Sequence, residues 1–363
     1  MHRSLLSRVL KPLVMATALT TGLAMSSPAA LAAEKSEFKI GWSIYVGWMP
    51  WDYMSKSGIM KKWADKYGIK VDVVQINDYI ESINQFTAGQ FDGCTMTNMD
   101  ALTIPAASGV DSTALIIGDF SNGNDGIVLK GTGKKLADIK GQKVNLVELS
   151  VSHYLLARAL ETVKLKEKDI KVVNTSDADI IAAYGTPNVT AVVTWNPQLS
   201  AIKAMPGASL VFDSSQIPGE ILDLLVVNTK TLQDNPKLGK ALVGAWYETM
   251  AVMSRDDAAG KAARGAMANA SGTDLAGFDA QLKTTRMFYT PGEAVTFSKS
   301  ADLVKTMDLV RTFSFSHGLL GQGAKSADAV GMAFPGGKTL GDAKNVKLRF
   351  DADYMNMAAE GKL

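Results

Sequence analysis

The sequence predicts an α/β fold with two lobes, each built on a mostly parallel sheet, and with extra helices at the C-terminal end. Apolar segments of strand type alternate with helical periodicity from residue 38 to residue 213, a rhythm typical of parallel sheets. The chain has 363 residues, enough for two lobes with separate cores. After residue 229 the pattern is mainly helical, and helices without strands cannot build a third α/β domain.

The first lobe is predicted to begin at residue 33. We expect strands at residues 38–45, 70–76, 91–97 and 112–120, and helices at residues 51–67, 78–88 and 99–107. Pro50 favours a helix start directly after the turn at residues 46–50. Gly89 is expected to end the second of these helices.

The second lobe is predicted over residues 126–223. We expect strands at residues 127–130, 143–148, 169–174, 190–196 and 209–213, and helices at residues 152–163, 177–183 and 197–205. Ser150 or Ser152 suits the N-cap of the first of these helices.

A strand at residues 223–228 is expected to return the chain to the first lobe, which therefore comprises residues 33–125 and 224–363. Later helices are expected at residues 231–254, 256–269, 274–284 and 300–317, packed on the first lobe. The C-terminal tail, residues 338–363, is expected to lie on the surface as the closing segment of the fold.

The N-terminus predicts export. Four charged or polar residues, His2, Arg3, Arg8 and Lys11, precede a short apolar core at residues 13–25. Small residues up to Ala32 supply a cleavage site, so residues 1–32 are predicted to be a signal peptide. The apolar core is too short to span a bilayer, which favours a freely diffusing periplasmic protein.

Charge and cysteine content exclude several classes of function. Removing the predicted signal takes away three basic residues, leaving 38 − 3 = 35 basic and 36 acidic side chains. A net charge near −1 argues against nucleic acid as a partner. The single cysteine, Cys94, cannot form an internal disulfide, and its apolar strand favours a buried structural thiol.

One stretch, residues 71–129, contains acids but neither Lys nor Arg. The acids are Asp72, Asp78, Glu81, Asp92, Asp100, Asp111, Asp119 and Asp125. Polar turns follow the strands in this stretch, and in open α/β sheets ligands bind beyond the carboxyl ends of the strands. A crevice lined by carboxylates favours a cationic or strongly hydrogen-donating small molecule.

Four segments in order carry a resemblance to a known family. They are Ile40-Gly41-Trp42 continuing to Trp51, the Ala-Gly-Gln-x-Asp turn within residues 86–93, residues 136–144, and the loop and helix start at residues 150–156. Over residues 38–227 the chain resembles periplasmic solute-binding proteins of ABC importers, in the nitrate, sulfonate and taurine branch. The resemblance implies the two-lobed type II binding-protein fold, with a hinge made of two crossovers. It also implies that the protein is a monomer and that its partner is an ABC permease in the inner membrane.

The chain departs from this branch in charge. Sites for sulfonate or nitrate call for Arg, Lys or helix N-termini, whereas these loops offer Asp and Trp. The chain is more similar to the subgroup associated with urea carboxylase and guanidine use. That resemblance implies a guanidinium-like or urea-like ligand, no cofactor and no catalysis.

Candidate ligand-binding residues lie at strand ends or helix starts. We expect aromatic walls from Trp48 and Trp51, hydrogen-bond acceptors from Asn98, Asp100 and Asp125, and second-lobe contacts from Glu148, Ser150, Trp195, Asn196 and Asp223 of the crossover strand. Several of them also have a plain structural alternative: packing for Trp48 and Trp51, a helix first turn for Asp100, a turn for Asp125 and a solvent-facing strand position for Glu148.

Alternative functions stay open at this point. The ligand could be a sulfonate, taurine, nitrate or a thiamine-like pyrimidine, because fold does not fix function. The rival from another class is an enzyme resembling thiamine-pyrimidine synthases, which carry a Cys-rich motif that this chain lacks. His153 and His317 are far apart in the sequence and have no cysteine beside them, so no metal site is predicted.

Overall fold

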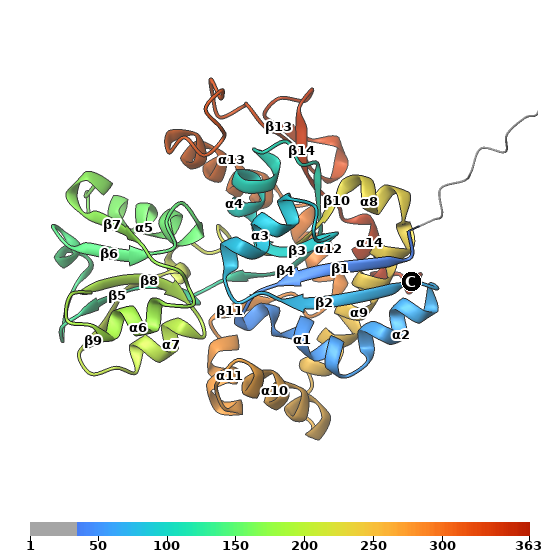
Figure 1. Ribbon diagram of the computed structural model, residues 1–363, viewed down its shortest axis with the longest axis horizontal. Helices are drawn as coiled ribbons and strands as arrows, with labels where there is room; N and C mark the ends of the chain where they lie inside the picture. Colours follow the sequence, from blue (N-terminus) through green and yellow to red (C-terminus); the bar gives the residue numbers. More distant parts are fainter. Residues whose placement is uncertain (1–34) are drawn as a thin grey trace, which may run out of the picture. The chain divides into compact units, whose positions relative to one another are not determined.

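The computed structural model describes residues 35–363, and the predicted signal peptide lies outside the described residues. Two β-sheets form the framework, with helices packed on them (Figure 1). The chain passes from the first sheet to the second between β4 and β5, and returns between β9 and β10. The predicted lobe limits at residues 125 and 223 lie near these passages and stay predictions.

The first sheet has nine strands, eight of them in the order β13-β12-β14-β4-β10-β3-β1-β2, with β11 paired to β4. These strands are β1 (Glu37–Trp42), β2 (Lys70–Gln75), β3 (Gly93–Thr97), β4 (Ser112–Ser121), β10 (Leu222–Asn228), β11 (Thr285–Met287), β12 (Gly331–Ala333), β13 (Thr339–Leu340) and β14 (Val346–Phe350). The crossover strand β10 runs antiparallel between β3 and β4. The sheet is therefore mixed, where the sequence predicted a mostly parallel one.

The second sheet has the order β7-β6-β8-β5-β9 and is drawn in green in Figure 1. Its strands are β5 (Asp125–Lys130), β6 (Lys143–Leu146), β7 (Lys171–Asn174), β8 (Ala191–Trp195) and β9 (Ala208–Asp213). Strand β5 pairs antiparallel with both β8 and β9, so this sheet is mixed as well.

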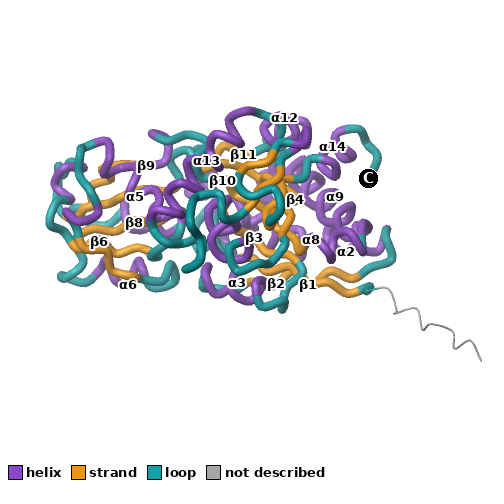
Figure 2. The backbone as a smooth tube through the Cα atoms, turned by 90° about the horizontal axis from the view of Figure 1, so that it is seen from above, coloured by secondary structure: helices purple, strands orange, loops and turns teal. Residues whose placement is uncertain are grey.

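Helices cover both sheets. The second sheet carries α5 (Val151–Thr162), α6 (Ile180–Gly185) and α7 (Gln198–Lys203). The first carries α1 (Met49–Lys56), α2 (Ile59–Lys66), α3 (Tyr79–Thr87), α4 (Asn98–Ala101), α8 (Thr229–Asp234), α9 (Pro236–Met253), α10 (Ala258–Ala270), α11 (Leu275–Leu282), α12 (Pro291–Ser298), α13 (Ala301–Ser316) and α14 (Asp353–Ala359). Figure 2 shows α2, α9 and α14 grouped beside the first sheet. We call each sheet with its helices a lobe.

Local sequence explains where these helices begin and end. The side chains of Asp78, Thr97 and Ser150 accept backbone N–H groups at the starts of α3, α4 and α5. The predicted N-cap at Ser150 is thereby confirmed. Gly58, with φ of 81°, separates α1 from α2 where the sequence predicted one helix. Likewise Pro236 starts α9 and divides the predicted helix at residues 231–254.

The C-terminal region differs from the expectation of helices followed by a surface segment. Strands β11, β12, β13 and β14 extend the first sheet, and β14 pairs parallel with the central strand β4. Leu348 and Phe350 of β14 are buried, so this segment is part of the core. Within residues 35–363, none of the helices combines the length and apolar character required to cross a lipid bilayer.

Candidate ligand-binding site

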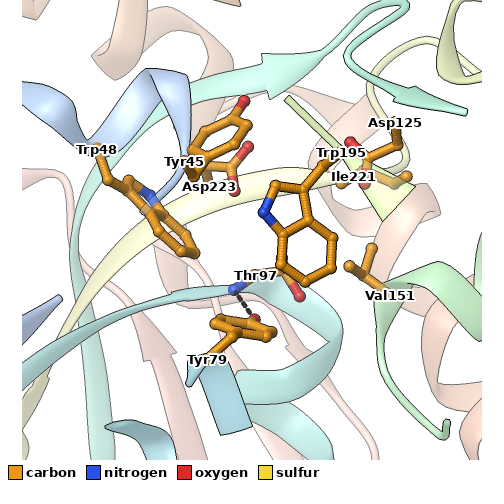
Figure 3. Close-up of a pocket in the computed structure, with 9 residues that line it drawn as sticks. All are labelled: Tyr45, Trp48, Tyr79, Thr97, Asp125, Val151, Trp195, Ile221 and Asp223. Carbon is orange, nitrogen blue, oxygen red and sulfur yellow. Dashed lines mark hydrogen bonds between the residues drawn. The ribbon is translucent and has the colours of Figure 1, made fainter. Parts of the chain in front are cut away.

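A small cavity lies where strands of both sheets meet. Its lining residues are Tyr45, Trp48, Tyr79, Thr97, Asp125, Val151, Trp195, Ile221 and Asp223 (Figure 3). Thr97 and Trp195 end β3 and β8, while Asp125 and Asp223 stand at or next to the start of antiparallel strands. The space between the lining atoms is about 270 Å³, including space open to solvent, but the part that the centre of a water molecule can reach is only about 10 Å³. The cavity is therefore nearly closed in this arrangement, with room for about one water molecule.

Four aromatic rings in edge-to-face or tilted contact form an aromatic cage on this cavity. Tyr45 and Trp48 have ring centroids 5.1 Å apart, Trp48 and Tyr79 5.7 Å, and Tyr79 and Trp195 5.6 Å. All four side chains are buried. The negative π-faces of such rings attract cations, with about 0.5–2 kcal/mol per contact.

A pair of carboxyl groups stands at one side of the cage. Asp119 of β4 and Asp223 of β10 are directly opposite each other in the antiparallel register. Like charges at such positions repel. The Tyr45 hydroxyl donates to Asp119 Oδ1 at 2.8 Å. Asp119 Oδ2 and Asp223 Oδ2 are both buried and accept no hydrogen bond from any described residue.

Two more carboxyl groups lie close to the cage. The Asp125 carboxylate accepts a short hydrogen bond from the Ser121 hydroxyl. Asp100 accepts hydrogen bonds from Tyr79 Oη at 2.6 Å and Thr97 Oγ1 at 2.8 Å, and so holds one ring of the cage in place. Both aspartates are buried.

Burial changes the acidity of all four carboxyl groups. It raises the pKa of Asp100 to about 6 and the pKa of Asp125 to about 7. Burial, with the nearby charge of Asp125, raises the pKa of Asp119 to about 7. Burial and repulsion from Asp119 and Asp125 raise the pKa of Asp223 well above its ordinary value. Each shift reflects the free-energy cost of a buried negative charge without a cationic partner.

No Lys, Arg or His stands among the described residues that line the cavity. A bound cation could therefore supply the missing counter-charge and at the same time contact the aromatic faces. Nor does the cavity offer a reactive thiol. Cys94 is buried, as predicted, and burial raises its thiol pKa to about 12, which leaves it un-ionised and poorly nucleophilic.

Four of the ten residues singled out from the sequence line the cavity, namely Trp48, Asp125, Trp195 and Asp223. Asp100 contacts the cage through Tyr79. The ligand role of each stays a prediction.

The other five lie elsewhere in structural roles. Trp51 stacks on Trp246 in the core, with centroids 5.4 Å apart. The Asn98 side chain bonds the backbone of Glu220 and Leu222, and Ser150 caps α5. Glu148 is exposed and lines a different groove, with Asp78 and Asn174. The Asn196 side chain bonds Ser200 and Thr284.

Sequence reasoning missed Tyr45, Tyr79, Thr97 and Asp119. The stretch without basic residues contained a usable signal, because Tyr79 and Asp119 both lie within residues 71–129. Their aromatic and acidic side chains match the chemistry already expected there. Tyr45 carried no signal beyond following the first strand.

Comparison with known proteins places this architecture in a family. The family model described as NMT1/THI5 like matches residues 59–258, more than half of the chain. The chain belongs to the NMT1/THI5-like family. A binding protein of Brucella abortus is 23% identical over 187 residues, which cover 51% of this chain and 57% of that protein. The NMT1/THI5-like chain thus spans a little over half the length of the Brucella binding proteins that it matches.

Two named relatives of this NMT1/THI5-like chain are binding proteins for taurine and for alkanesulfonates. The taurine-binding periplasmic protein of Escherichia coli K12 is 24% identical over 143 residues, covering 39% of this chain and 44% of that one. The alkanesulfonate-binding protein SsuA of Xanthomonas axonopodis pv. citri, solved with bound MOPS, gives a TM-score of 0.65 at 18% identity. That comparison covers 82% of this chain and 99% of SsuA. The two-lobed type II binding-protein fold expected from the sequence is thereby confirmed.

Proposed function

We propose that this chain is the periplasmic substrate-binding component of an ABC importer and that its solute is a small, planar, nitrogen-rich cation of the guanidinium type. The chain would enclose the solute between its lobes and deliver it to an inner-membrane permease without chemical change. The carrier role is supported by the family and by relatives that are binding proteins. The export signal predicted at residues 1–32 agrees with a periplasmic location.

The proposed ligand class rests on one observation: the buried carboxyl groups of Asp125 and Asp223 and the aromatic cage line one cavity, whose described lining contains no basic side chain. A guanidinium ion carries its charge over several N–H donors in one plane. It can donate to the unpaired oxygen of Asp223 and to Asp125 while its faces contact Trp48 and Trp195, and the carboxyl of Asp119 lies directly opposite Asp223.

The interaction energies are of the size that a carrier requires. Micromolar affinity corresponds to about 8 kcal/mol. Charge-assisted hydrogen bonds contribute about 1.5–3 kcal/mol each, and cation–π contacts add about 0.5–2 kcal/mol each. Three such hydrogen bonds and two ring contacts would contribute about 5.5–13 kcal/mol before the entropy of association is subtracted, a range that includes the required value.

A second candidate solute is a sulfonate such as taurine. The names of the relatives favour it, as does the Trp48 indole N–H, a buried donor that has no hydrogen-bond partner among the described residues. A sulfonate group, however, would bring a negative charge next to Asp119, Asp125 and Asp223. The repulsion makes this the weaker proposal.

A thermal-shift panel separates the candidates. The purified protein is melted at about pH 8 with guanidinium chloride, urea, taurine, MOPS or nitrate, each at constant ionic strength. Guanidinium at about 100 times its Kd should stabilise the protein by about 2.7 kcal/mol. Sodium chloride at the same concentration is the control for ionic strength. A shift with taurine and none with guanidinium would overturn the ligand proposal, and conversion of any solute to a product would overturn the carrier role.

A further inference from the structure

Three side chains from the two lobes converge outside the candidate site. His153 belongs to α5 of the second lobe, and Glu167 begins the short 3-10 turn Glu167–Asp169 of the same lobe. His317 directly follows α13 of the first lobe. His317 Nε2 lies 2.6 Å from Glu167 Oε1, and His153 Nε2 lies 3.4 Å from Glu167 Oε2. One carboxylate thus joins a histidine of each lobe.

The surroundings of His317 require a proton on each ring nitrogen. His317 Nδ1 lies 2.9 Å from the carbonyl oxygen of Phe313, which can only accept. It also lies 3.0 Å from the Ser316 hydroxyl, which donates its hydrogen to that same carbonyl, so Nδ1 carries a hydrogen. His317 Nε2 faces a carboxylate oxygen of Glu167, which also accepts. Contact with the two histidines lowers the pKa of Glu167 to about 2, so this carboxyl is ionised. A doubly protonated His317 satisfies both contacts at once.

In His153, unlike in His317, one ring nitrogen accepts a hydrogen bond and so carries no hydrogen. Its Nδ1 accepts the backbone N–H of Leu149 at 3.1 Å, so in the neutral ring the hydrogen is on Nε2, facing Glu167. The ring is buried and its Nε2 has no hydrogen-bond partner of good geometry among the described residues. A nitrogen that carries a hydrogen cannot ligate a metal ion. The three side chains have the spacing of a metal site, but the tautomer of His153 opposes that function.

The rest of the interface consists of aromatic contacts and further charges. The Phe313 ring stacks on His317, with centroids 4.0 Å apart, and packs edge-on against Tyr154 of α5 at 5.1 Å. The charged side chains that line the same groove from α5, the following loop and α13 are Arg158, Glu161, Lys164, Lys166, Glu167 and Asp308. Arg158 is already bonded to Glu220 and Glu161, and among the described residues the ring nitrogens of His153 and His317 are the groups that pair with the Glu167 carboxylate.

We propose that His317 and Glu167 form a proton-dependent latch that fastens the C-terminal end of α13 to the second lobe and so favours the closed arrangement of the lobes. Loss of one proton from His317 removes the ion pair and leaves a ring nitrogen facing a carboxylate, which repel each other. The latch is therefore fastened when both ring nitrogens of His317 carry a hydrogen and is released when one is lost.

NMR of the imidazole nitrogens tests the protonation pattern in the full protein. The sequence has only three histidines, His2, His153 and His317, so each signal can be assigned with a single variant. The latch predicts two protonated nitrogens on His317 and a neutral His153 with its hydrogen on Nε2 at about pH 6. In Glu167→Gln the signal of His317 Nε2 should shift and that of His317 Nδ1 should stay, because only Nε2 faces residue 167. A neutral His317 at about pH 6 in the wild type would overturn the proposal.

Small-angle scattering tests the effect on closure without any solute. At about pH 6 the radius of gyration of Glu167→Gln should exceed that of the wild type, and at about pH 9 the two values should agree; comparing the two proteins at the same pH cancels the ionisation of the cavity carboxyls, which both proteins share. Glu161→Gln is the matched control, since Glu161 lines the same groove and pairs with Arg158 instead. The control should behave as the wild type does. Equal pH dependence in Glu167→Gln and wild type would contradict the latch, as would Zn²⁺ raising the melting point of the wild type but not of Glu167→Gln.

Discussion

Replacement of Asp125 by Asn should weaken solute binding and stabilise the empty protein, two effects that a structural carboxylate would not combine. Asn has nearly the same shape and can still accept the hydrogen bond of Ser121. It removes one negative charge from the cavity lining. A charge-assisted hydrogen bond contributes about 1.5–3 kcal/mol, so the Kd for guanidinium should rise about 10- to 160-fold.

The gain in stability follows from the raised pKa of Asp125. Burial moves this pKa from 3.8 to about 7, a difference of 7 − 3.8 = 3.2 pH units. Because the folded-state pKa is raised, the stabilising contribution is complete below about pH 4 and is lost as the pH rises to about pH 7. At 1.36 kcal/mol per pH unit the loss reaches at most about 4 kcal/mol. The amide introduced by Asp125→Asn cannot ionise, so the variant should escape this loss.

Titration calorimetry with guanidinium and denaturant unfolding, both at about pH 8, measure the two effects. The matched control is Asp351→Asn. Burial also raises the pKa of Asp351, but this residue lines a different cavity, near the C-terminal strands. The control should leave the guanidinium affinity unchanged. Wild-type affinity in Asp125→Asn, or an empty variant no more stable than the empty wild type, would refute the reasoning.

Three further predictions concern the same cavity. Trp48→Leu should weaken guanidinium binding about 2- to 30-fold in calorimetry by removing one cation–π contact, whereas Trp246→Leu, in the core, should lower stability and spare affinity. In Glu167→Gln, which lacks the latch, guanidinium affinity should fall as the pH drops from about 8 to 5, because the carboxyls of Asp119 and Asp125, with pKa of about 7, become protonated; an affinity of this variant that rises in acid would contradict the cation assignment. In Gly47→Ala the added Cβ would lie 2.6 Å from Asp119 Oδ2, so guanidinium binding should be lost, whereas Gly265→Ala, with nothing within 4 Å, should bind normally.

The sequence predicted the alternation of strands and helices because that alternation is local. Gly58 and Pro236 divide helices at places where local signals are also readable, yet apolar periodicity on both sides concealed the breaks. The C-terminal strands escaped prediction for another reason. They are two to five residues long and are stabilised by pairing with β4 and with one another, which no local pattern records.

The acidic character of the candidate site could be predicted from the sequence, but only some of the residues that form it could. The absence of basic residues from residues 71–129 indicated an acidic cavity, and Asp100, Asp119 and Asp125 of that stretch are buried around it. Glu81 of the same stretch is exposed, so composition alone did not separate site from surface. The role of Asp119 depends on its register opposite Asp223, which only the folded sheet defines.

The division of the cage between the two sheets has a consequence for unloading. Tyr45, Trp48 and Tyr79 accompany the first sheet, whereas Trp195 ends a strand of the second. Separation of the two sheets would move Trp195 away from the other three rings and admit water to the cavity carboxyls. In the proposed carrier role, a permease that only opens the protein would therefore release the solute in one step, without a group of its own that competes for it.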